Sequence, residues 1–339
     1  MRIRKSASVG VLLILLLFLS AFLLSGCGGA SRKTRELRMN VTAPEDSAWM
    51  VAAENFQELI EKNTKGRYKI IISPGEEITE GNAEAGVKNL INGGVELSLY
   101  SLADAQIFQE KLAVAAMPFL FADYDSVDEI LFNGDGKDAI FDLIREMGCE
   151  PLGLGENGFR QITNNIRSIL SPADLPGLII RVPHNHFLTE LFGQFNADTA
   201  VMGWDAAFPL LQSDGVSGQE NSLDLIKSSH TYQIQRYLTI WNCSYDPICL
   251  SASAAFWEEL SESDREIFQN AAGEACQLEV AAIREQNADI LDLFTQSGVE
   301  VTILTPDELN LFKSRTSPLY AQWRERVGDD LFAAFGVNF

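Results

Sequence analysis

Two arginines stand in segments where a permanent positive charge is costly to bury without a partner. Arg160 lies among β-prone residues in segment 158–164, and Arg181 lies in the apolar run 178–182 directly before Pro183. The planar guanidinium matches a carboxylate through two parallel hydrogen bonds, which lysine cannot reproduce. We therefore expect both arginines to bind a carboxylate that arrives from solution. A structural ion pair with an acidic residue of the chain is the alternative for either one.

The elements that position these residues begin with an alternating first half. Strands are predicted over residues 37–42, 68–72 and 95–100, with helices over 49–61 and 83–91 between them. This order is typical of a parallel sheet covered by helices, in which ligands bind beyond the carboxyl ends of the strands. Because Tyr100 and Ser101 come at the end of the third strand, we expect them on the rim of a cleft; a plain surface loop is the alternative.

A second alternating half contains both arginines. Strands are predicted over 159–163 and 178–182, followed by a helix over 187–195 and a glycine-punctuated strand and turn over 215–221. These elements place Arg160, Arg181 and Asn221 near strand ends.

A helical pattern longer than thirty residues follows the second half. Ser261 is a predicted N-cap, and apolar residues recur at helical spacing up to Gly298 without a proline. At 1.5 Å per residue such a helix is roughly 50 Å long, so it is predicted to bridge two lobes.

The N-terminus has the pattern of an export signal. A basic start, an apolar run over 9–24 and the small residues before Cys27 resemble the signal box of bacterial lipoproteins, in which the cysteine becomes lipidated. Residues 1–26 are therefore predicted to be a signal peptide and 27–36 a tether, with Cys27 as the lipidation site. A single transmembrane anchor is the alternative, although the run is shorter than a spanning helix usually needs.

The net charge argues against two classes of partner. The whole chain carries −21, and without the three positive charges of residues 1–26 the remainder carries −24. So acidic a surface disfavours nucleic acid and an electrostatic grip on anionic membranes. An anion would have to bind at a local, enclosed positive site.

The sequence carries no recognisable catalytic, cofactor or metal motif. It lacks a G-x-S-x-G elbow, an HExxH pair and a phosphate loop, and its three histidines (His184, His186 and His230) have no ligand spacing with acids or thiols. We expect no enzyme activity, no cofactor and no metal site. Besides Cys27 there are four cysteines, for which disulfides in any of three pairings or buried free thiols are both open.

Several segments together resemble the solute-binding proteins of tripartite ATP-independent periplasmic (TRAP) transporters. The similarity extends along nearly the whole chain after the signal, and the order and spacing of the segments carry it. They are GFRQ at 158–161 with TN at 163–164, DLPG at 174–177, RVP at 181–183, GQEN at 218–221, PG at 74–75, MPFLF at 117–121 and FW at 256–257.

This resemblance implies a role for several residues. Arg181 matches the main carboxylate-binding arginine of the family, Arg160 its frequent second arginine and Asn221 its pocket asparagine. Trp204 falls on a pocket aromatic position and His184 on a cleft position.

The chain departs from the family pattern at three places. Ser217 stands where aspartate is usual, Trp204 where phenylalanine is common, and Gly155 where an aromatic residue is frequent. Such positions contact the end of the ligand away from its carboxylate, so the resemblance does not identify that end.

The predicted fold is α/β and periplasmic-binding-protein-like, with two lobes, each a mostly parallel sheet with flanking helices. Lobe I is predicted to span 37–157 plus about 247–285, and lobe II 158–246 plus about 286–339.

The predicted function is extracytoplasmic capture of an organic acid by hinge closure, with delivery to the membrane permease subunits of a TRAP transporter. We expect a lipid-anchored monomer. The alternatives are a binding protein of an ATP-driven importer, a ligand sensor and, less in keeping with the motifs, a secreted enzyme.

Overall fold

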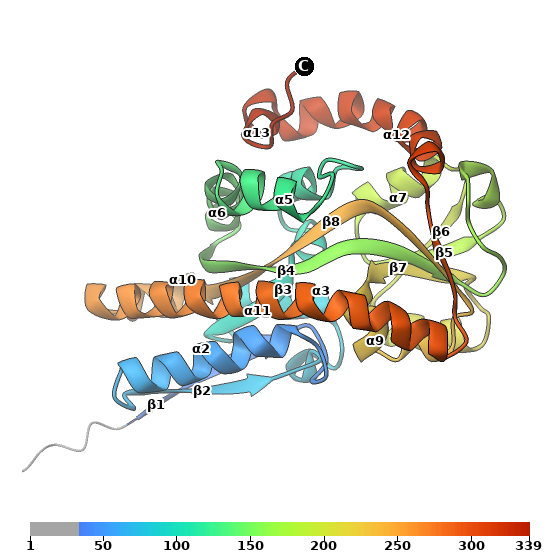
Figure 1. Ribbon diagram of the computed structural model, residues 1–339. Coiled ribbons are helices and arrows are strands. Elements are labelled where there is room, and N and C mark those ends of the chain that lie inside the picture. The colour runs from blue at the N-terminus through green and yellow to red at the C-terminus, as the bar shows by residue number, and fades with distance from the viewer. Residues whose placement is uncertain (1–33) are drawn as a thin grey trace, which may run out of the picture. The chain divides into compact units, whose positions relative to one another are not determined.

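A nine-stranded mixed sheet organises the part of the chain that the computed structural model describes, residues 34–339 (Figure 1). The predicted signal peptide, Cys27 and most of the predicted tether lie outside the described residues. The strands follow the order β2-β1-β3-β8-β4-β7-β5-β6, with β9 on β8. Their bounds are β1 Arg35–Val41, β2 Tyr68–Ser73, β3 Leu97–Ser101, β4 Cys149–Asn164, β5 Ile179–Val182, β6 Asp198–Val201, β7 Gly218–Ser222, β8 Tyr237–Ser253 and β9 Glu300–Ile303.

Two parallel regions flank a central antiparallel pair. On one side β1 pairs with β3, and on the other β5 pairs with both β6 and β7, in each case in parallel. Between them lie β4 and β8, of 16 and 17 residues, which pair antiparallel with each other. Because β8 also pairs with β3 and β4 also pairs with β7, this central pair joins the two parallel regions into one sheet. The α/β fold with a mixed sheet and flanking helices agrees with the predicted class.

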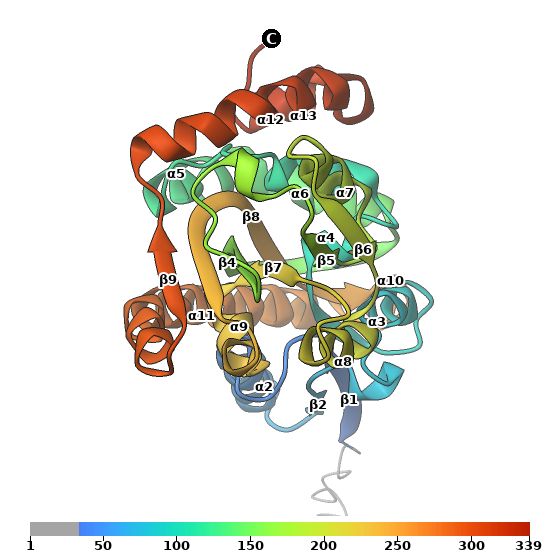
Figure 2. The ribbon, with the colours of Figure 1, turned by 90° about the vertical axis from the view of Figure 1, so that its right-hand side faces the viewer.

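The helices cover both sides of the sheet. The longest, α11, has 35 residues and runs alongside β4 and β8, with α12 on the other side of these strands (Figures 1 and 2). It packs on β4 and β9, on α2, which follows β1, and on α9, which follows β7, so it contacts helices attached to both parallel regions, as the predicted bridge requires. The α-helix bounds are α2 Trp49–Asn63, α3 Ala83–Ile91, α4 Leu102–Ala105, α5 Tyr124–Val127, α6 Gly136–Glu146, α7 His186–Gly193, α8 Trp204–Gln212, α9 Leu223–Ser228, α10 Ala254–Glu259, α11 Glu262–Gln296, α12 Pro306–Val327 and α13 Asp329–Ala334.

The central strands are longer than the sequence pattern indicates. The sequence predicts a strand over 159–163, whereas β4 spans Cys149–Asn164 and continues through three glycines. Its partner β8 continues through Pro247. The pairing of β4 with β8 shifts register at three places, among them between Glu156 and Gly158, and Gly158 adopts a φ of +93°. The bulges bend the strands without ending them.

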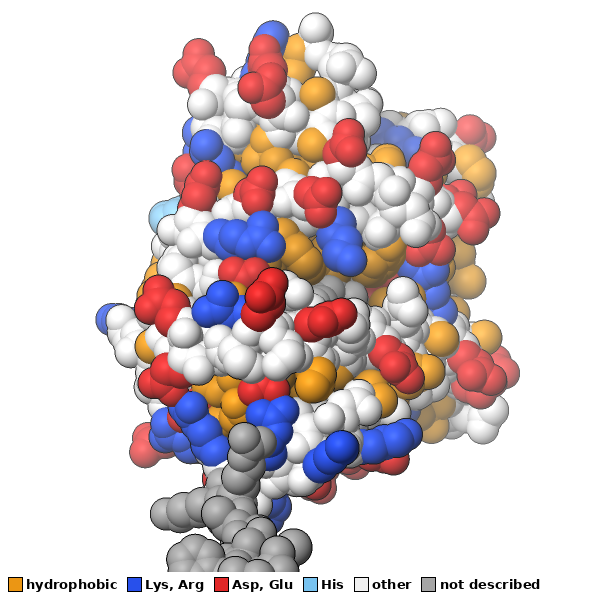
Figure 3. All heavy atoms as spheres, turned by 90° about the vertical axis from the view of Figure 1, so that its left-hand side faces the viewer, with side chains coloured by type: hydrophobic (Ala, Val, Ile, Leu, Met, Phe, Trp, Pro, Cys, Tyr) orange, Lys and Arg blue, Asp and Glu red, His pale blue; other side chains and the backbone are white. Residues whose placement is uncertain are grey.

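The surface charges and the cysteines of the described residues bear on the remaining predictions. On the face seen in Figure 3, acidic and basic side chains are interspersed. Cys149, Cys243, Cys249 and Cys276 are all buried and free, which decides between the two alternatives left open by the sequence. Among the residues described, no helix is long and apolar enough to cross a membrane.

Position 155 has no room for a side chain, because the buried carboxylate of Glu279 occupies the space where its Cβ atom would lie. A Cβ atom at this position would lie 2.5 Å from Glu279 Oε2 and 2.9 Å from Ile248 Cγ1. The same Glu279 oxygen accepts the backbone N–H of Glu156 at 2.9 Å, which ties α11 to β4. The family resemblance leads one to expect an aromatic residue here. Glu279 and Ile248 leave no room for such a side chain, and the chain has glycine instead.

We predict that Gly155→Ala lowers the free energy of unfolding by about 1–3 kcal/mol, because the added methyl group must displace Glu279 or Ile248. Gly273→Ala, in α11 with open space around the position, is the control and should raise stability by up to ~1 kcal/mol. Urea unfolding measures both variants. Equal stabilities for the two would contradict this account of Gly155.

Candidate functional site

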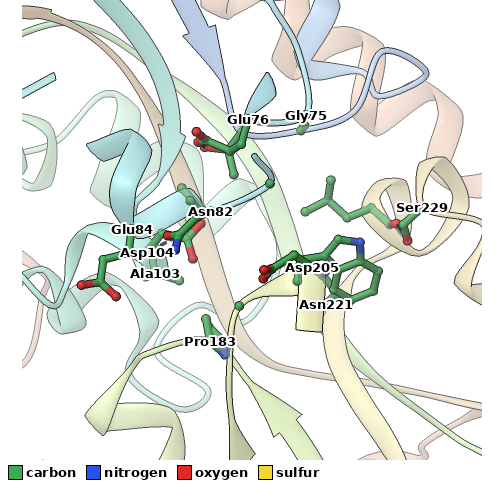
Figure 4. A pocket seen from close by; sticks show the side chains of 18 of the residues that line it. Gly75, Glu76, Asn82, Glu84, Ala103, Asp104, Pro183, Asp205, Asn221 and Ser229 are labelled. Carbon is green, nitrogen blue, oxygen red and sulfur yellow. Dashed lines mark hydrogen bonds between the residues drawn. The ribbon is translucent and has the colours of Figure 1, made fainter. Parts of the chain in front are cut away.

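A cavity of about 280 Å³ lies beyond the carboxyl ends of strands from both parallel regions (Figure 4). This is where open parallel sheets bind ligands, and the volume is just below the usual range of about 300–1,000 Å³ for ligand pockets. Residues after β1, β2 and β3 line one side, and residues after β5 and β6 line the other. The lining from the strand ends includes Thr42, Glu76, Asp104, His184, Trp204 and Asn221.

Arg181 presents its guanidinium to this cavity from β5, between two parallel neighbours. The residue is buried, at 6% exposure. Its Nε and Nη2 atoms donate to the carbonyl oxygen of Met202 at 3.0 and 2.8 Å. Among the described residues, no carboxylate lies within 4.0 Å of it. Burial outweighs the attraction of the nearby acids Asp104 and Glu220 and lowers the pKa of Arg181 to about 10, so the group is still charged at neutral pH.

Arg160 also lines the cavity, but it already has protein partners. It is buried on β4, where Nε and Nη2 donate to the Glu220 carboxylate and Nη1 donates to Asp246 Oδ2 at 2.9 Å. These two carboxylates outweigh the cost of burial and raise the pKa of Arg160. Glu220 and Asp246 thus provide Arg160 with the structural ion pair that was the alternative, and contact of this arginine with a ligand stays a prediction.

A count of donors separates the two arginines further. A guanidinium has five N–H donors. Arg160 uses one from Nε, two from Nη2 and one from Nη1, which leaves one. Arg181 uses one from Nε and one from Nη2, which leaves three. Only Arg181 keeps donors on both terminal nitrogens, the fork that grips a carboxylate with two bonds.

Three further predicted residues line the same cavity. Trp204 begins α8, and its ring lies 5.5 Å from the Arg181 guanidinium carbon, within cation–π range. His184 is half-exposed, and its Nδ1 atom lies 3.6 Å from Glu84 Oε2 on the other side of the cavity. Asn221 ends the GQEN segment on β7 and accepts the backbone N–H of Ser222, while its side-chain N–H₂ has no partner among the described residues.

The two residues predicted at the end of β3 point to opposite faces of the strand. Ser101 lines the cavity and donates to Asp246 at 2.7 and 2.8 Å. Tyr100 points to the opposite face of the strand, as alternation requires, and is fully buried in the core with its hydroxyl 3.0 Å from Ser251 Oγ. The structure does not bring Tyr100 to the cavity.

The acidic residues at the cavity are not among the site residues that the sequence predicts. Glu76 and Asp104 follow the ends of β2 and β3, and Asp246 holds Arg160, Ser101 and Asn157 together from β8. The position of Glu76 directly after Pro74-Gly75 could have identified it by the same strand-end reasoning. Asp246 lies within a long bulged strand and gives no such signal. Within the described part of the chain, no group of three or more His, Cys, Asp or Glu side chains could hold a metal ion.

Polar contacts cross from one side of the cavity to the other. Asn185 Nδ2 donates to the Ala103 carbonyl oxygen at 3.1 Å. At the start of α2, Ser47 Oγ and the Ala48 backbone N–H donate to the Asp224 carboxylate at 2.7 and 3.1 Å. In each contact the two partners are far apart in the chain and lie on opposite sides of the cavity. Residues from both sides therefore close the cavity together.

Comparison with known proteins decides the family. Residues 39–326 match the model of the bacterial extracellular solute-binding proteins, family 7. The chain belongs to this family. The TRAP solute-binding resemblance of the sequence motifs is thereby confirmed.

Solved structures and curated relatives agree. A TRAP periplasmic solute-binding protein of Ralstonia eutropha with bound (S)-2-acetolactate is 30% identical, with a TM-score of 0.84 over 89% of this chain and 98% of that one. A counterpart from Polaromonas with bound D-erythronate is 27% identical, with a TM-score of 0.85 over 90% and 99%. The C4-dicarboxylate-binding protein of Bacillus subtilis is 26% identical over 83% of this chain and 80% of its own length.

We predict that substitution of the two arginines changes the free energy of unfolding by very different amounts. Arg160→Met leaves Glu220 and Asp246 buried without their counter-charge and should lower the free energy of unfolding by about 3–5 kcal/mol. Arg181→Met removes a buried charge that has no carboxylate partner, and should change stability by less than about 1 kcal/mol. Urea unfolding without added ligand compares the two variants, each the control for the other. A loss for Arg181→Met as large as that for Arg160→Met would contradict these assignments.

Proposed function

We propose that this solute-binding protein captures an organic acid through the Arg181 guanidinium and delivers it to the permease of a TRAP-type transporter. The observation that supports this most is that three N–H donors of Arg181 have no partner in residues 34–339, although the group is buried in a small cavity next to Trp204. Charge-assisted hydrogen bonds contribute roughly 1.5–3 kcal/mol each, so a two-bond grip in this site would dominate the affinity for a small acid.

The relatives support the same class of ligand. The Ralstonia and Polaromonas proteins were solved with acetolactate and erythronate, each of which has one carboxylate. The Bacillus subtilis relative is named for C4-dicarboxylates, which have two. The shared group is the carboxylate, which we assign to Arg181.

Arg160 has a different role in this proposal. Its ion pairs hold β4, β7 and β8 together at the floor of the cavity, and its one remaining N–H on Nη1 provides at most a single further contact to the ligand. Asn221, Ser101, Trp204 and His184 complete the proposed contacts.

Capture is proposed to occur by a hinge between lobe I (37–157 plus about 247–285) and lobe II (158–246 plus about 286–339). Both lobes line the cavity, and the contacts of Asn185 with Ala103 and of Asp224 with Ser47 and Ala48 join them. On opening, these contacts break and Arg181 becomes hydrated. Binding therefore does not require a permanently buried unpaired charge.

The protein is proposed to bind its ligand without converting it, as a monomer held outside the cytoplasm by a lipid on Cys27. The lipoprotein-like signal of residues 1–27 supports the anchor, and the family supports the extracellular location.

We predict that at least one acid in a panel of organic acids raises the melting temperature of the protein. At a hundred times its dissociation constant, a ligand should stabilise the fold by ~2.7 kcal/mol. In calorimetry of that acid, Arg181→Lys should weaken binding at least tenfold, because lysine keeps the charge but loses the fork.

The matched control is Arg145→Lys, on the surface and paired with Asp142 and Glu150, which should bind as the unaltered protein does. Unchanged affinity in Arg181→Lys would disprove the role of Arg181. A panel in which a neutral sugar or peptide shifts the melting temperature and no acid does would disprove the ligand class.

A further inference from the structure

The charges around the cavity are unequal. Four acidic residues line it: Glu76, Glu84, Asp104 and Asp205 (Figure 4). Of the two cationic residues in the described lining, Arg160 is already neutralised by Glu220 and Asp246. Arg181 is therefore the one cation there that keeps its charge available. The site can compensate a single carboxylate, and a second would lie among like charges.

Glu76 is held in place as a fixed hydrogen-bond acceptor. It has a left-handed backbone, with a φ of +57°, which is uncommon for a residue with a side chain. Its carboxylate accepts from Asn40 Nδ2 and, at 2.7 Å each, from Thr42 Oγ1 and Thr79 Oγ1. Gly86 leaves room for this carboxylate, because a Cβ there would lie 2.1 Å from Glu76 Oε2. The group is only 2% exposed, yet it faces the cavity.

Two lining carboxyl groups, those of the exposed Asp205 and of Asp104, have no hydrogen-bond or ion-pair partner among the described residues, and Asp104 is the more buried of the two. It lies on α4, partly buried, and no hydrogen bond or ion pair joins its carboxyl group to another described residue. The charges that act on it most are Asp246, Arg181, Arg160 and Glu76. Among the described residues, the cavity thus holds an unused donor fork on Arg181 and, on Asp104, an unused carboxyl group that is buried enough for its interactions to be strong.

We propose that the ligand is a hydroxylated monocarboxylate, whose single carboxylate binds Arg181 and whose hydroxyl groups donate to Asp104 and Glu76, and that dicarboxylates are rejected by these acids. The inference rests on the proposed function and narrows it. It also separates this protein from a relative named for C4-dicarboxylates.

The protonation of Asp104 agrees with this arrangement. Burial, together with the nearby Asp246 and Glu76 and against the opposing pull of Arg181 and Arg160, raises the pKa of Asp104 to about 7. Above that pH the carboxylate is charged and repels a second carboxylate. Below it the group is neutral and the repulsion weakens. Rejection of dicarboxylates should therefore be stronger at pH 8 than at pH 6.

Calorimetry with matched pairs of acids tests the proposal. Each pair shares its chain and stereochemistry and differs only in whether the far end is a hydroxymethyl group or a carboxylate. D-erythronate with meso-tartrate, D-galactonate with galactarate and 4-hydroxybutyrate with succinate are three such pairs. In every pair that binds, we expect the monocarboxylate to bind at least tenfold more tightly at pH 8, and this ratio to fall at pH 6.

Asp104→Asn identifies the residue responsible. It should raise the affinity for the dicarboxylate of the best pair at least fivefold relative to its partner, and remove the pH dependence of the ratio. Asp142→Asn, which deletes the same charge at a surface position with 75% side-chain exposure, should leave both unchanged.

Three results would contradict all or part of the inference. A dicarboxylate that binds as tightly as its partner in the unaltered protein would disprove it, while the proposed capture of an acid by Arg181 would stand. If Asp104→Asn prefers the monocarboxylate as strongly as the unaltered protein does at both pH values, Asp104 is not the residue that rejects dicarboxylates. If no acid of any pair or of the wider panel binds, the proposed function fails and this inference fails with it.

Discussion

The burial of the Arg181 guanidinium without a carboxylate partner is the constraint on which the rest of the site depends. A charge in this position is expensive because the interior cannot replace its lost hydration, and the Met202 carbonyl satisfies only two of its donors. The remaining donors point to a site in which a ligand supplies the counter-charge. The central strand position of Arg181, between β6 and β7, fixes the fork at the strand ends.

Arg160 shows what the same residue type does when the protein supplies the carboxylates. Glu220 from β7 and Asp246 from β8 surround it, so its charge serves to join three strands at the floor of the cavity. Asp246 also accepts from Ser101 and Asn157, which extends the network to β3 and to the strand that carries Arg160. The ion pairs of Arg160 hold together the strands at the floor of the cavity that Arg181 lines. In our proposal, the surrounding acids limit which ligands Arg181 can accept.

The sequence predicts the parts of this arrangement that follow from local patterns. The bounds of α3 and α11, the parallel strands other than β6 and the placement of Arg181 near a strand terminus all follow from periodicity and turn residues. The continuity of β4 and β8 does not, because bulges at Glu156–Gly158 and elsewhere interrupt alternation without ending the strands. Nor can local sequence show that Arg160 meets Asp246, 86 residues away, or that alternation turns Tyr100 into the core and Ser101 into the cavity. These depend on register across the sheet, which tertiary packing sets.

A crystal structure of the protein with a bound organic acid tests the central claim most directly. The account predicts that both oxygens of one ligand carboxylate lie within about 3 Å of Arg181 Nη1 and Nη2. Arg160 should keep its bonds to Glu220 and Asp246. A ligand carboxylate seated on Arg160, with Arg181 bonded only to Met202, would contradict the account.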